Sequence, residues 1–288
     1  MRRFIRLAAP SLKVGPALMP RPVPPALGET YRISDLARIE VKCSVPPYVA
    51  DVPNEWLQHI VREFRSNIEV AVRLCEEVDD PHRLNISPII KDDRPDISNF
   101  QRTHGLSGCV VTFASLFDRL LEHDLPRARE EFLAWPSDDD TAFARLRLWA
   151  SGKPVLATPH AFAQVMRQLS EKVFWGGYHQ RDLLLVLSSR WGELSNRDRR
   201  QIEARLLRGP IHWEGEEDDS YVERRAWAVL ERIHWLRTHG CEFSFDVDNE
   251  IATRRADAPS WKPEISDHAA ESREMRGGWV ATDTKFGP

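Results

Sequence analysis

The amino-acid sequence predicts a mainly all-α protein, built as an irregular helical bundle or solenoid of antiparallel helix pairs. Apolar residues recur at three- and four-residue steps in several separate segments, which is the spacing of one buried helix face. Capping residues, Gly and Pro stand at the ends of these segments, and the loops between them are mostly short. Short connections make successive helices antiparallel neighbours. The sequence shows no period of about 34–47 residues, so we expect no regular named repeat.

Residues 1–50 are expected to form an irregular, Pro-rich and basic lead-in to the helices. This segment contains eight Arg or Lys residues against three acidic ones, and its prolines favour an extended chain. Because charge runs are usually solvated, we interpret it as a lead-in or as a junction to an upstream domain. A basic arm for a phosphate-rich partner is the alternative. The α-helical domain then covers residues 51–288, with a possible subdivision near residue 105.

The first helices are indicated by two apolar faces. Residues 53–78 are expected to form one helix, with Asp51 as its cap. Its inward side chains are Trp56, Ile60, Val61, Phe64, Ile68, Ala71 and Leu74. After a long connection over residues 79–105, a second helix is expected over residues 107–123. Its inward side chains are Val110, Val111, Phe113, Ala114, Phe117, Leu120 and Leu121.

Capping and helix-breaking residues mark the ends of the helices in the middle of the chain. The three acids at 138–140 open a helix that ends before Pro154. Thr158 followed by Pro159 indicates a cap with proline at the first helical position. Residues 183–187 are apolar on all sides, which predicts that their helix is the most buried one.

The last helices are bounded in the same way. Ser195 and Asp198 resemble a capping box, and Gly209 followed by proline ends that helix. A long helix is expected over residues 220–239, with Gly240 as its C-terminal glycine. Residues 241–248 alternate between polar and apolar and predict a short strand, with a second one at residues 279–282. The minor strands are therefore expected near the C-terminus.

Composition limits the classes of function. Of the 288 residues, 42% are hydrophobic and 29% are charged, which suits a folded protein with a sizeable core. The net charge of −4, with bases and acids interleaved, gives no support to nucleic-acid binding. The four cysteines form no CxxC pair for zinc or redox chemistry, and few cysteines beside ten tryptophans indicate a reducing compartment. No apolar run is long enough for a membrane span or a signal peptide, so we expect a cytoplasmic protein.

One acidic cluster is a candidate metal site. Glu214, Glu216 and Asp218 offer the oxygen ligands that divalent cations prefer, and His212 lies just ahead of them. A bound ion there would support metal-assisted hydrolysis. The cluster lacks the ordered spacing of a calcium loop, however, and it precedes a helix whose dipole favours negative charge. The sequence therefore favours a solvated helix start here, and equally at the acids of residues 138–140.

Other motifs of catalysis are incomplete. Residues 105–108 (Gly-Leu-Ser-Gly) match only half of a nucleophile elbow, and no strand is expected before them. The chain contains no HExxH, no GxGxxG and no P-loop, and the Gly277-Gly278 pair is best explained as a tight turn. Four tryptophans at helical spacing could stack on bases but fit a core better, namely Trp175, Trp191, Trp227 and Trp235. We therefore expect no cofactor.

Several longer stretches carry a family resemblance. They are residues 174–187, 209–216, 224–227, 235–236, 258–261 and 277–284, which include Trp175-Gly176-Gly177 and Gly209-Pro210. Together they resemble the uncharacterised helical C-terminal region of large bacterial proteins whose N-terminal part is a sirtuin-like NAD-hydrolysing domain. The resemblance covers roughly residues 105–288. Its motifs are sequence patterns without a chemical signature.

The resemblance implies a role in defence against bacteriophage. In that family the helical region is expected to sense a phage component or to mediate assembly, while NAD chemistry resides in the other domain. This chain contains no sirtuin-like nucleotide-binding domain, so no NAD-site residue can be carried over. Its final residues, 284–288, suggest a fragment or the product of a split gene.

Three hypotheses follow from the sequence. The first is a non-enzymatic helical sensor or scaffold of a bacterial antiphage defence protein, with a protein partner or an upstream effector domain and no membrane association. The second is a metal-assisted hydrolase that uses the acids of residues 214–219 with His212. The third is a nucleic-acid-binding accessory protein that uses the basic first fifty residues.

Overall fold

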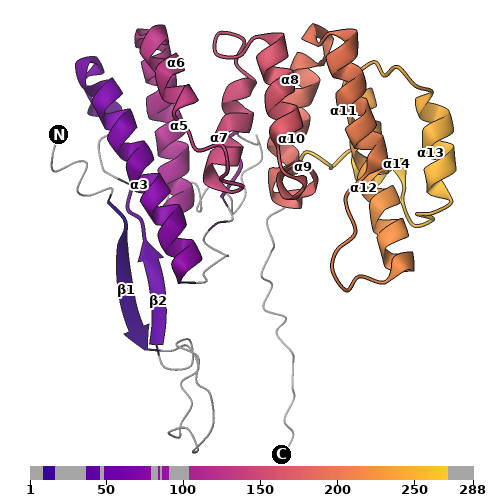
Figure 1. Ribbon diagram of the computed structural model, residues 1–288, viewed down its shortest axis with the longest axis horizontal. Helices are drawn as coiled ribbons and strands as arrows, with labels where there is room; N and C mark the ends of the chain where they lie inside the picture. Colours follow the sequence, from indigo (N-terminus) through magenta and orange to yellow (C-terminus); the bar gives the residue numbers. More distant parts are fainter. Residues whose placement is uncertain are drawn as a thin grey trace, which may run out of the picture.

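The chain folds into a row of α-helices, as the sequence predicts (Figure 1). The computed structural model describes residues 9–16, 37–45, 49–78, 84, 86–90 and 104–271. These residues contain eleven α-helices and one two-stranded sheet. Figure 1 shows the helices standing side by side, and the chain advances from one end of the row to the other. The mainly all-α fold class is therefore confirmed.

The helices are named in chain order. The first part of the row contains α3 (Leu57–Glu77), α5 (Gly105–His123), α6 (Leu125–Leu133) and α7 (Ala142–Ser151). The middle contains α8 (Pro159–Gln168), α9 (Glu171–Trp175) and α10 (Gly177–Arg190). The far end contains α11 (Asn196–Arg208), α12 (Asp218–Thr238), α13 (Val247–Arg255) and α14 (Pro263–Ser266). Three 3₁₀ turns complete the order, η1 (Val49–Asp51), η2 (Asn54–Trp56) and η4 (Trp191–Glu193).

The sheet lies near the N-terminus, where an irregular lead-in was expected. Strands β1 (Ser11–Pro16) and β2 (Ala37–Lys42) pair antiparallel, with Leu12 opposite Val41 and Val14 opposite Ile39. Both short segments alternate apolar and polar residues with the period of a strand, and this local pattern outweighs the proline content of the region. Val41 is buried against the first helices and anchors the hairpin to the row.

The strand expected at residues 241–248 does not form, because side chains satisfy its backbone. The indole of Trp191 donates to the Glu242 carbonyl at 2.8 Å, and the Ser244 N–H donates to the Glu203 carboxylate at 2.8 Å. The segment ends where α13 begins at Val247. Alternation still has a physical basis here, since Phe243 and Phe245 both pack against the second core. The second expected strand, at residues 279–282, lies outside the described residues.

Most predicted helix ends are confirmed by their capping hydrogen bonds. The Thr158 side chain accepts from the Ala161 N–H at 3.2 Å, and the Ser195 side chain accepts from the Asp198 N–H at 3.1 Å. Gly240 follows α12 with a φ of 83°, which suits glycine. Asp51 does not cap α3, because it ends η1, the turn η2 follows before α3, and the N-cap residue is Trp56.

Helix α6 was not expected, although the sequence contains its start signal. The Asp124 side chain accepts from the Arg127 N–H at 3.2 Å, and a proline follows in the first turn. The helix is short, and only Ala128 and Glu131 are buried on it. Its apolar face is therefore too small for periodicity to reveal.

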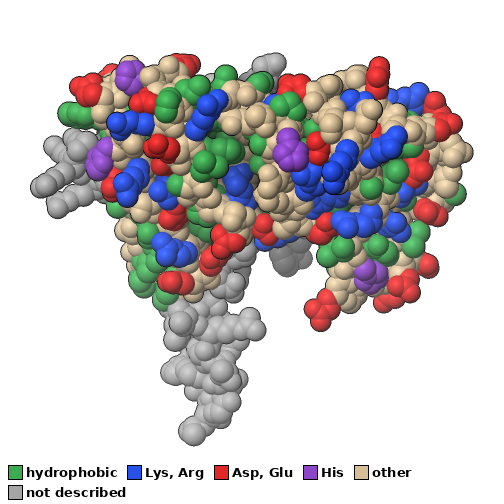
Figure 2. Space-filling view, turned by 45° about the horizontal axis from the view of Figure 1, so that its top comes forward, with side chains coloured by type: hydrophobic (Ala, Val, Ile, Leu, Met, Phe, Trp, Pro, Cys, Tyr) green, Lys and Arg blue, Asp and Glu red, His purple; other side chains and the backbone are tan. Residues whose placement is uncertain are grey.

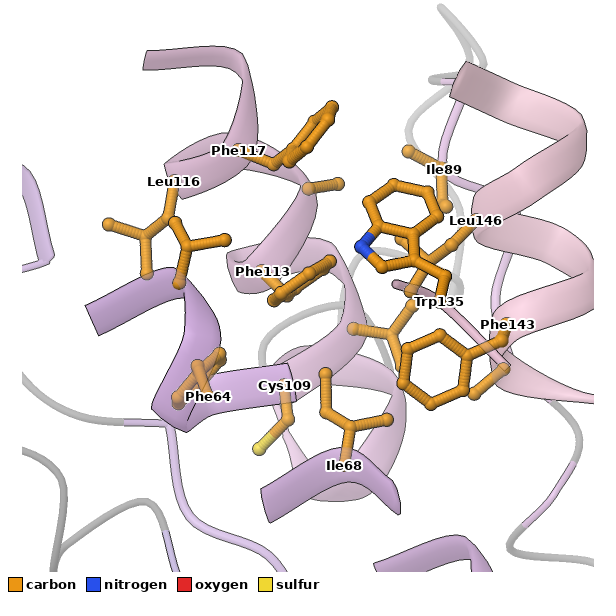
Figure 3. Close-up of a cluster of buried hydrophobic side chains, with 14 of the residues drawn as sticks. Phe64, Ile68, Ile89, Cys109, Phe113, Leu116, Phe117, Trp135, Phe143 and Leu146 are labelled. Carbon is orange, nitrogen blue, oxygen red and sulfur yellow. The ribbon is translucent and has the colours of Figure 1, made fainter. Parts of the chain in front are cut away.

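The first core surrounds one tryptophan (Figure 3). Trp135 follows α6, and its ring centroid lies 4.8 Å from that of Phe117 and 5.6 Å from that of Phe113. Phe64 of α3 and Phe143 of α7 belong to the same buried cluster. A second core joins α8 to α12, and a third places Trp261 against α12. The aromatic side chains thus serve mainly as core.

A buried ion pair joins α7 to α10. The Arg145 guanidinium donates to the Asp182 carboxylate at 2.7 Å, and both side chains are almost completely shielded from solvent. Arg145 also donates to the Tyr178 carbonyl. The other carboxylate oxygen of Asp182 accepts from the Ile90 N–H at 3.3 Å. Two charges are tolerated in the interior because they are paired and hydrogen-bonded.

The first turns of α10 also hold the two chain segments that reach it from afar. Arg181 donates to the Ile90 carbonyl at 3.2 Å and to the Ala270 carbonyl at 2.5 Å. Gln180 donates to the Ala269 carbonyl at 2.8 Å and to the Glu231 carboxylate at 3.0 Å. Helix α10 therefore fixes both the segment before α5 and the segment after α14.

We expect His179 to make the protein acid-sensitive. Burial, and secondly the nearby Arg145, lower the pKa of this imidazole to about 3, although a hydrogen bond at the Asp140 backbone opposes the shift. In the unfolded chain its pKa is about 6.5. The contribution of the neutral His179 imidazole to stability is therefore complete above pH 6.5 and is lost progressively as the pH falls towards 3. From proton linkage, the free energy of unfolding should fall by about 2 kcal/mol between pH 7 and pH 5.

Urea unfolding of the wild type and of His179→Gln at pH 7 and pH 5 measures this loss. The glutamine variant cannot titrate, so its free energy of unfolding should change less over this interval by about 2 kcal/mol. Equal pH dependence of the two proteins would contradict the assignment.

The two glycines between α9 and α10 should respond differently to alanine. A Cβ at Gly176 would come closer than 3.0 Å to the backbone carbonyl of Lys172, whereas a Cβ at Gly177 meets nothing within 4 Å. We expect Gly176→Ala to lower the free energy of unfolding by about 1–3 kcal/mol. Gly177→Ala is the matched control and should change it by less than about 0.5 kcal/mol. Similar losses in both variants would show that the Lys172 contact is not decisive.

Candidate functional site

The acidic loop singled out by the sequence joins α11 to α12. Helix α11 ends at Gly209, whose φ is 75° and where a Cβ would lie 2.6 Å from the Arg225 side chain. Arg225 donates to the Arg208 carbonyl at 2.7 Å, and Arg254 donates to the Leu207 carbonyl at 2.5 Å. Two guanidinium groups thus satisfy the last carbonyls of α11, so the chain leaves the helix at a fixed point.

Arg224 organises the loop itself. Its guanidinium donates twice to the Glu216 carboxylate, at 2.5 and 2.6 Å, and once to the Ile211 carbonyl at 2.9 Å. The guanidinium carbon also lies 3.8 Å from the centroid of the Trp213 ring. A bidentate ion pair and a stacked aromatic ring are the geometries that a guanidinium favours. One side chain of α12 therefore holds three positions of the loop.

Further contacts tie the loop to the start of α12. The Trp213 N–H donates to Glu216 at 3.1 Å, and the Tyr221 hydroxyl donates to the Pro210 carbonyl at 3.3 Å. Hydrogen bonds from Arg224, followed by weaker contributions, lower the pKa of Glu216 to about 2. Glu216 therefore stays ionised and bound to Arg224 throughout the neutral range.

The structure does not gather the candidate metal ligands. Glu216 is occupied by Arg224, and Glu214 is exposed. His212 lies 3.4 Å from Asp218, whose side chain is 98% exposed, and the other ring nitrogen of His212 faces the Trp213 carbonyl. Among the described residues, no three His, Cys, Asp or Glu side chains come together as an ion site. The loop is thus arranged as an ion-paired turn.

Large apolar side chains remain exposed on this ordered loop. Ile211 is 55% exposed, Trp213 is 60% exposed, and Val222 on the first turns of α12 is 42% exposed. We call these three residues the Trp213 patch. Four acids stand beside these residues in the sequence, namely Glu214, Glu217, Asp218 and Asp219, and the Arg224 guanidinium lies over the Trp213 ring. In Figure 2 the protrusion at the lower right carries hydrophobic side chains, with Lys or Arg side chains above them and acidic side chains at its lower edge.

The polar cleft at the start of α11 resembles a catalytic group but is a helix cap. It has a volume of about 290 Å³ and is lined by His160, Arg167, Ser195, Arg197, Asp198 and Gln201. The Ser195 hydroxyl donates to Asp198 at 2.7 Å, and Arg167 donates to Asp198 at 2.6 Å. His160 is 3.8 Å from the same carboxylate. The Ser195 hydroxyl also accepts from the Asp198 N–H, so this serine is engaged as the N-cap of α11.

The other sequence candidates are also structural. Ser107 lies in the first turn of α5 and accepts from the Ser87 N–H at 2.7 Å, and no described strand precedes it. Asp139 accepts from the Thr141 and Phe143 N–H groups at the start of α7. Trp191 and Trp235 are buried, which confirms them as core, whereas Trp175 and Trp227 are partly buried. The Gly277-Gly278 pair lies outside the described residues.

Comparison with known proteins yields no relative for this chain. No family model, no curated protein and no solved structure matches it. Within the described part of the chain, no helix combines the length and the apolar character that crossing a bilayer requires. The functional argument therefore depends on the geometry of the chain itself.

The exposed tryptophan is the feature that sequence patterns did not reveal. Ile211 and Trp213 lie outside every helical period, which is a signal that they are not core. The acids beside them made this segment a candidate metal site, although the sequence favours a solvated helix start. Glu216 and Arg224 are eight positions apart along the chain, so the fold is needed to bring their side chains together. The same fold places Arg224 over the Trp213 ring.

We expect Arg224→Gln to loosen the loop without unfolding the protein. The change removes the ion pair to Glu216 and the stacked cation, both at the surface, so global stability should fall by less than about 1 kcal/mol. Backbone amides of residues 211–217 should exchange with deuterium at least about tenfold faster, because their local opening becomes cheaper.

The matched control is Arg237→Gln, which breaks an exposed ion pair to Asp248 at the other end of α12. It should leave exchange in residues 211–217 unchanged. If Arg224→Gln also left that exchange unchanged, the rigidity of the loop would have another origin.

Proposed function

We propose that this protein is a non-enzymatic helical scaffold or sensor that binds a protein partner through the Trp213 patch. The observation that carries the proposal is a tryptophan left 60% exposed in a loop that an ion pair holds in place. Tryptophan is among the residues that contribute most to protein interfaces. An aromatic side chain that is already fixed loses little conformational entropy on binding.

The charges around the patch define the partner. Four acids are sequence neighbours of the three apolar residues, so a complementary surface offers a large apolar group flanked by Lys or Arg. Such an arrangement is available on a basic amphipathic helix or on an extended basic segment of another protein. We therefore propose a partner segment of mixed basic and apolar character.

The distribution of ionisable groups supports a non-enzymatic role. Among the described residues, several buried arginines bind backbone carbonyls. Arg190 donates to the carbonyls of Ser151 and Ala157, each at 2.8 Å. Arg232 donates to the Trp175 carbonyl at 2.9 Å and closes the end of α9. These groups are engaged in tertiary structure. In the part of the chain that the structure describes, no set of acids converges in a way that would support the hydrolase alternative.

The nucleic-acid alternative has less support. It depends on the basic first fifty residues, of which residues 1–8 and 17–36 lie outside the described part of the chain. Within β2, Arg38 is paired with Glu40. The overall charge of −4 opposes a long-range attraction to phosphates.

The family resemblance supplies the proposed biological setting. It suggests a module of a bacterial antiphage defence system in the cytoplasm, where NAD chemistry or another effector activity resides on another domain or chain. The partner of the Trp213 patch would then be that effector or a phage component. Incubation with NAD tests the non-enzymatic part, because NAD loss caused by this chain alone would refute it.

We expect selection of displayed peptides on the immobilised chain to enrich sequences with basic residues beside a large apolar one. Trp213→Ala should weaken the binding of those peptides by about 30-fold or more, which corresponds to the loss of a central interface residue. Isothermal titration calorimetry with the synthetic peptide measures this change.

Leu133→Ala is the control, because Leu133 is 83% exposed and lies on α6, at the other end of the row. It should bind the selected peptides as the wild type does. Acidic peptides, or peptides that bind Trp213→Ala at full affinity, would count against the proposed surface.

A further inference from the structure

Two cysteines from distant segments meet beside the first core. Cys43 directly follows β2, and Cys109 lies in the first part of α5. The two thiols are hydrogen-bonded to each other. Both also line one crevice, together with Phe64, Ile68 and Leu106. The side chains are 66 positions apart in sequence, so only the tertiary fold brings them together.

The crevice between them favours a direct bond between the two sulfur atoms. It is too narrow to hold a water molecule, and most of its lining is apolar. No third His, Cys, Asp or Glu of the described residues joins the two thiols, so they do not form a metal site. Cys75 and Cys241 are each buried, and Cys43 is the only described cysteine that is partly exposed. An oxidant from solvent therefore reaches this pair through Cys43.

We propose that Cys43 and Cys109 form a reversible disulfide that covalently ties the end of the β1–β2 hairpin to helix α5. The bond would fix a hairpin that otherwise reaches the row mainly through β2 and α3. A two-stranded sheet alone is marginally stable, so this attachment determines how firmly the hairpin is held. The proposal is independent of the Trp213 patch.

The oxidant is a low-molecular-weight disulfide such as oxidised glutathione. The Cys43 thiolate attacks one sulfur of that disulfide, a mixed disulfide forms, and one glutathione thiolate leaves and takes up a proton. Cys109 then loses its proton to solvent, and its sulfur attacks the Cys43 sulfur. The bond between the two cysteines forms as the second glutathione leaves. Two protein thiols are oxidised and one glutathione disulfide is reduced to two thiols.

Burial of Cys109 slows this thiol–disulfide exchange, whereas the proximity of the two thiols favours the disulfide at equilibrium. The hydrogen bond to Cys43, and then burial, raise the pKa of the Cys109 thiol well above its usual range. In the mixed disulfide the Cys43 thiol is no longer present, but burial still raises the pKa of Cys109, so little of its thiolate forms at neutral pH and the second step is slow. Once formed, the disulfide closes a long loop of the unfolded chain, and its stabilising effect grows with loop length.

Equilibration of the folded protein with mixtures of reduced and oxidised glutathione tests the proposal. After the free thiols are blocked with N-ethylmaleimide, mass spectrometry of the digest should show a peptide that links Cys43 to Cys109. The melting temperature of the oxidised protein should rise by about 5 °C or more. Deuterium exchange of the amides in β2 should become slower.

Two variants complete the test. Cys75→Ser combined with Cys241→Ser removes the other two thiols and should keep both the crosslink and the thermal shift. Cys43→Ser changes a partly exposed position, so it should fold, and it should lose both. The proposal is overturned if the crosslink forms only after addition of urea, if another cysteine pair dominates, or if the folded protein keeps four free thiols at equilibrium.

Discussion

The buried ion pair between Arg145 and Asp182 is the constraint on which the arrangement of the helices depends. Each charge is tolerated in the interior only because the other is present, and removal of one partner of such a pair costs about 3–5 kcal/mol. Asp182 also accepts from Ile90, and the adjacent Arg181 and Gln180 hold Ile90 and residues 269–270. Helix α10 stands in the middle of the row (Figure 1), so its first turns set the position of segments from both halves. The pair specifies one arrangement of the chain more than it adds stability, since apolar packing could replace its energy.

How much of the fold the sequence predicts depends on whether a signal is local. Caps at Thr158 and Ser195 are made by residues three positions apart, so the sequence contains all of the information needed to place them. Residues 241–248 show the opposite case. Their alternation correctly places Phe243 and Phe245 on the core, but whether they become a strand depends on partners more than 40 positions away, at Trp191 and Glu203. The β1–β2 hairpin likewise needs Val41 to reach the first core.

The candidate site shows the same limit at the level of chemistry. The acids of residues 214–219 drew attention to this loop, because charge density is visible in a sequence. The role of these acids is not visible in the sequence. Glu216 forms an ion pair with Arg224, so its carboxylate is not available as a metal ligand. The exposure of Trp213 does not follow from the sequence, because a tryptophan in a helical protein is usually core, whereas here the ring lies on a surface loop beside the Arg224 guanidinium. Exposure is a property of the whole fold.

Arginine performs two different tasks in this chain, and their separation supports an interaction role. Arg145, Arg190 and Arg232 are buried and bind carbonyls and two carboxylates, those of Asp182 and Glu193, so they fix helix ends against one another. Arg224 does the same for a surface loop, and the result is a rigid display of apolar side chains in water. Leaving a tryptophan ring in water normally costs free energy. An ion pair that only held the ring in this exposed position would not help the chain to fold. The cost has a physical purpose if the ring is later covered by a partner, because the ion pair then supplies the order that the interface would otherwise have to impose.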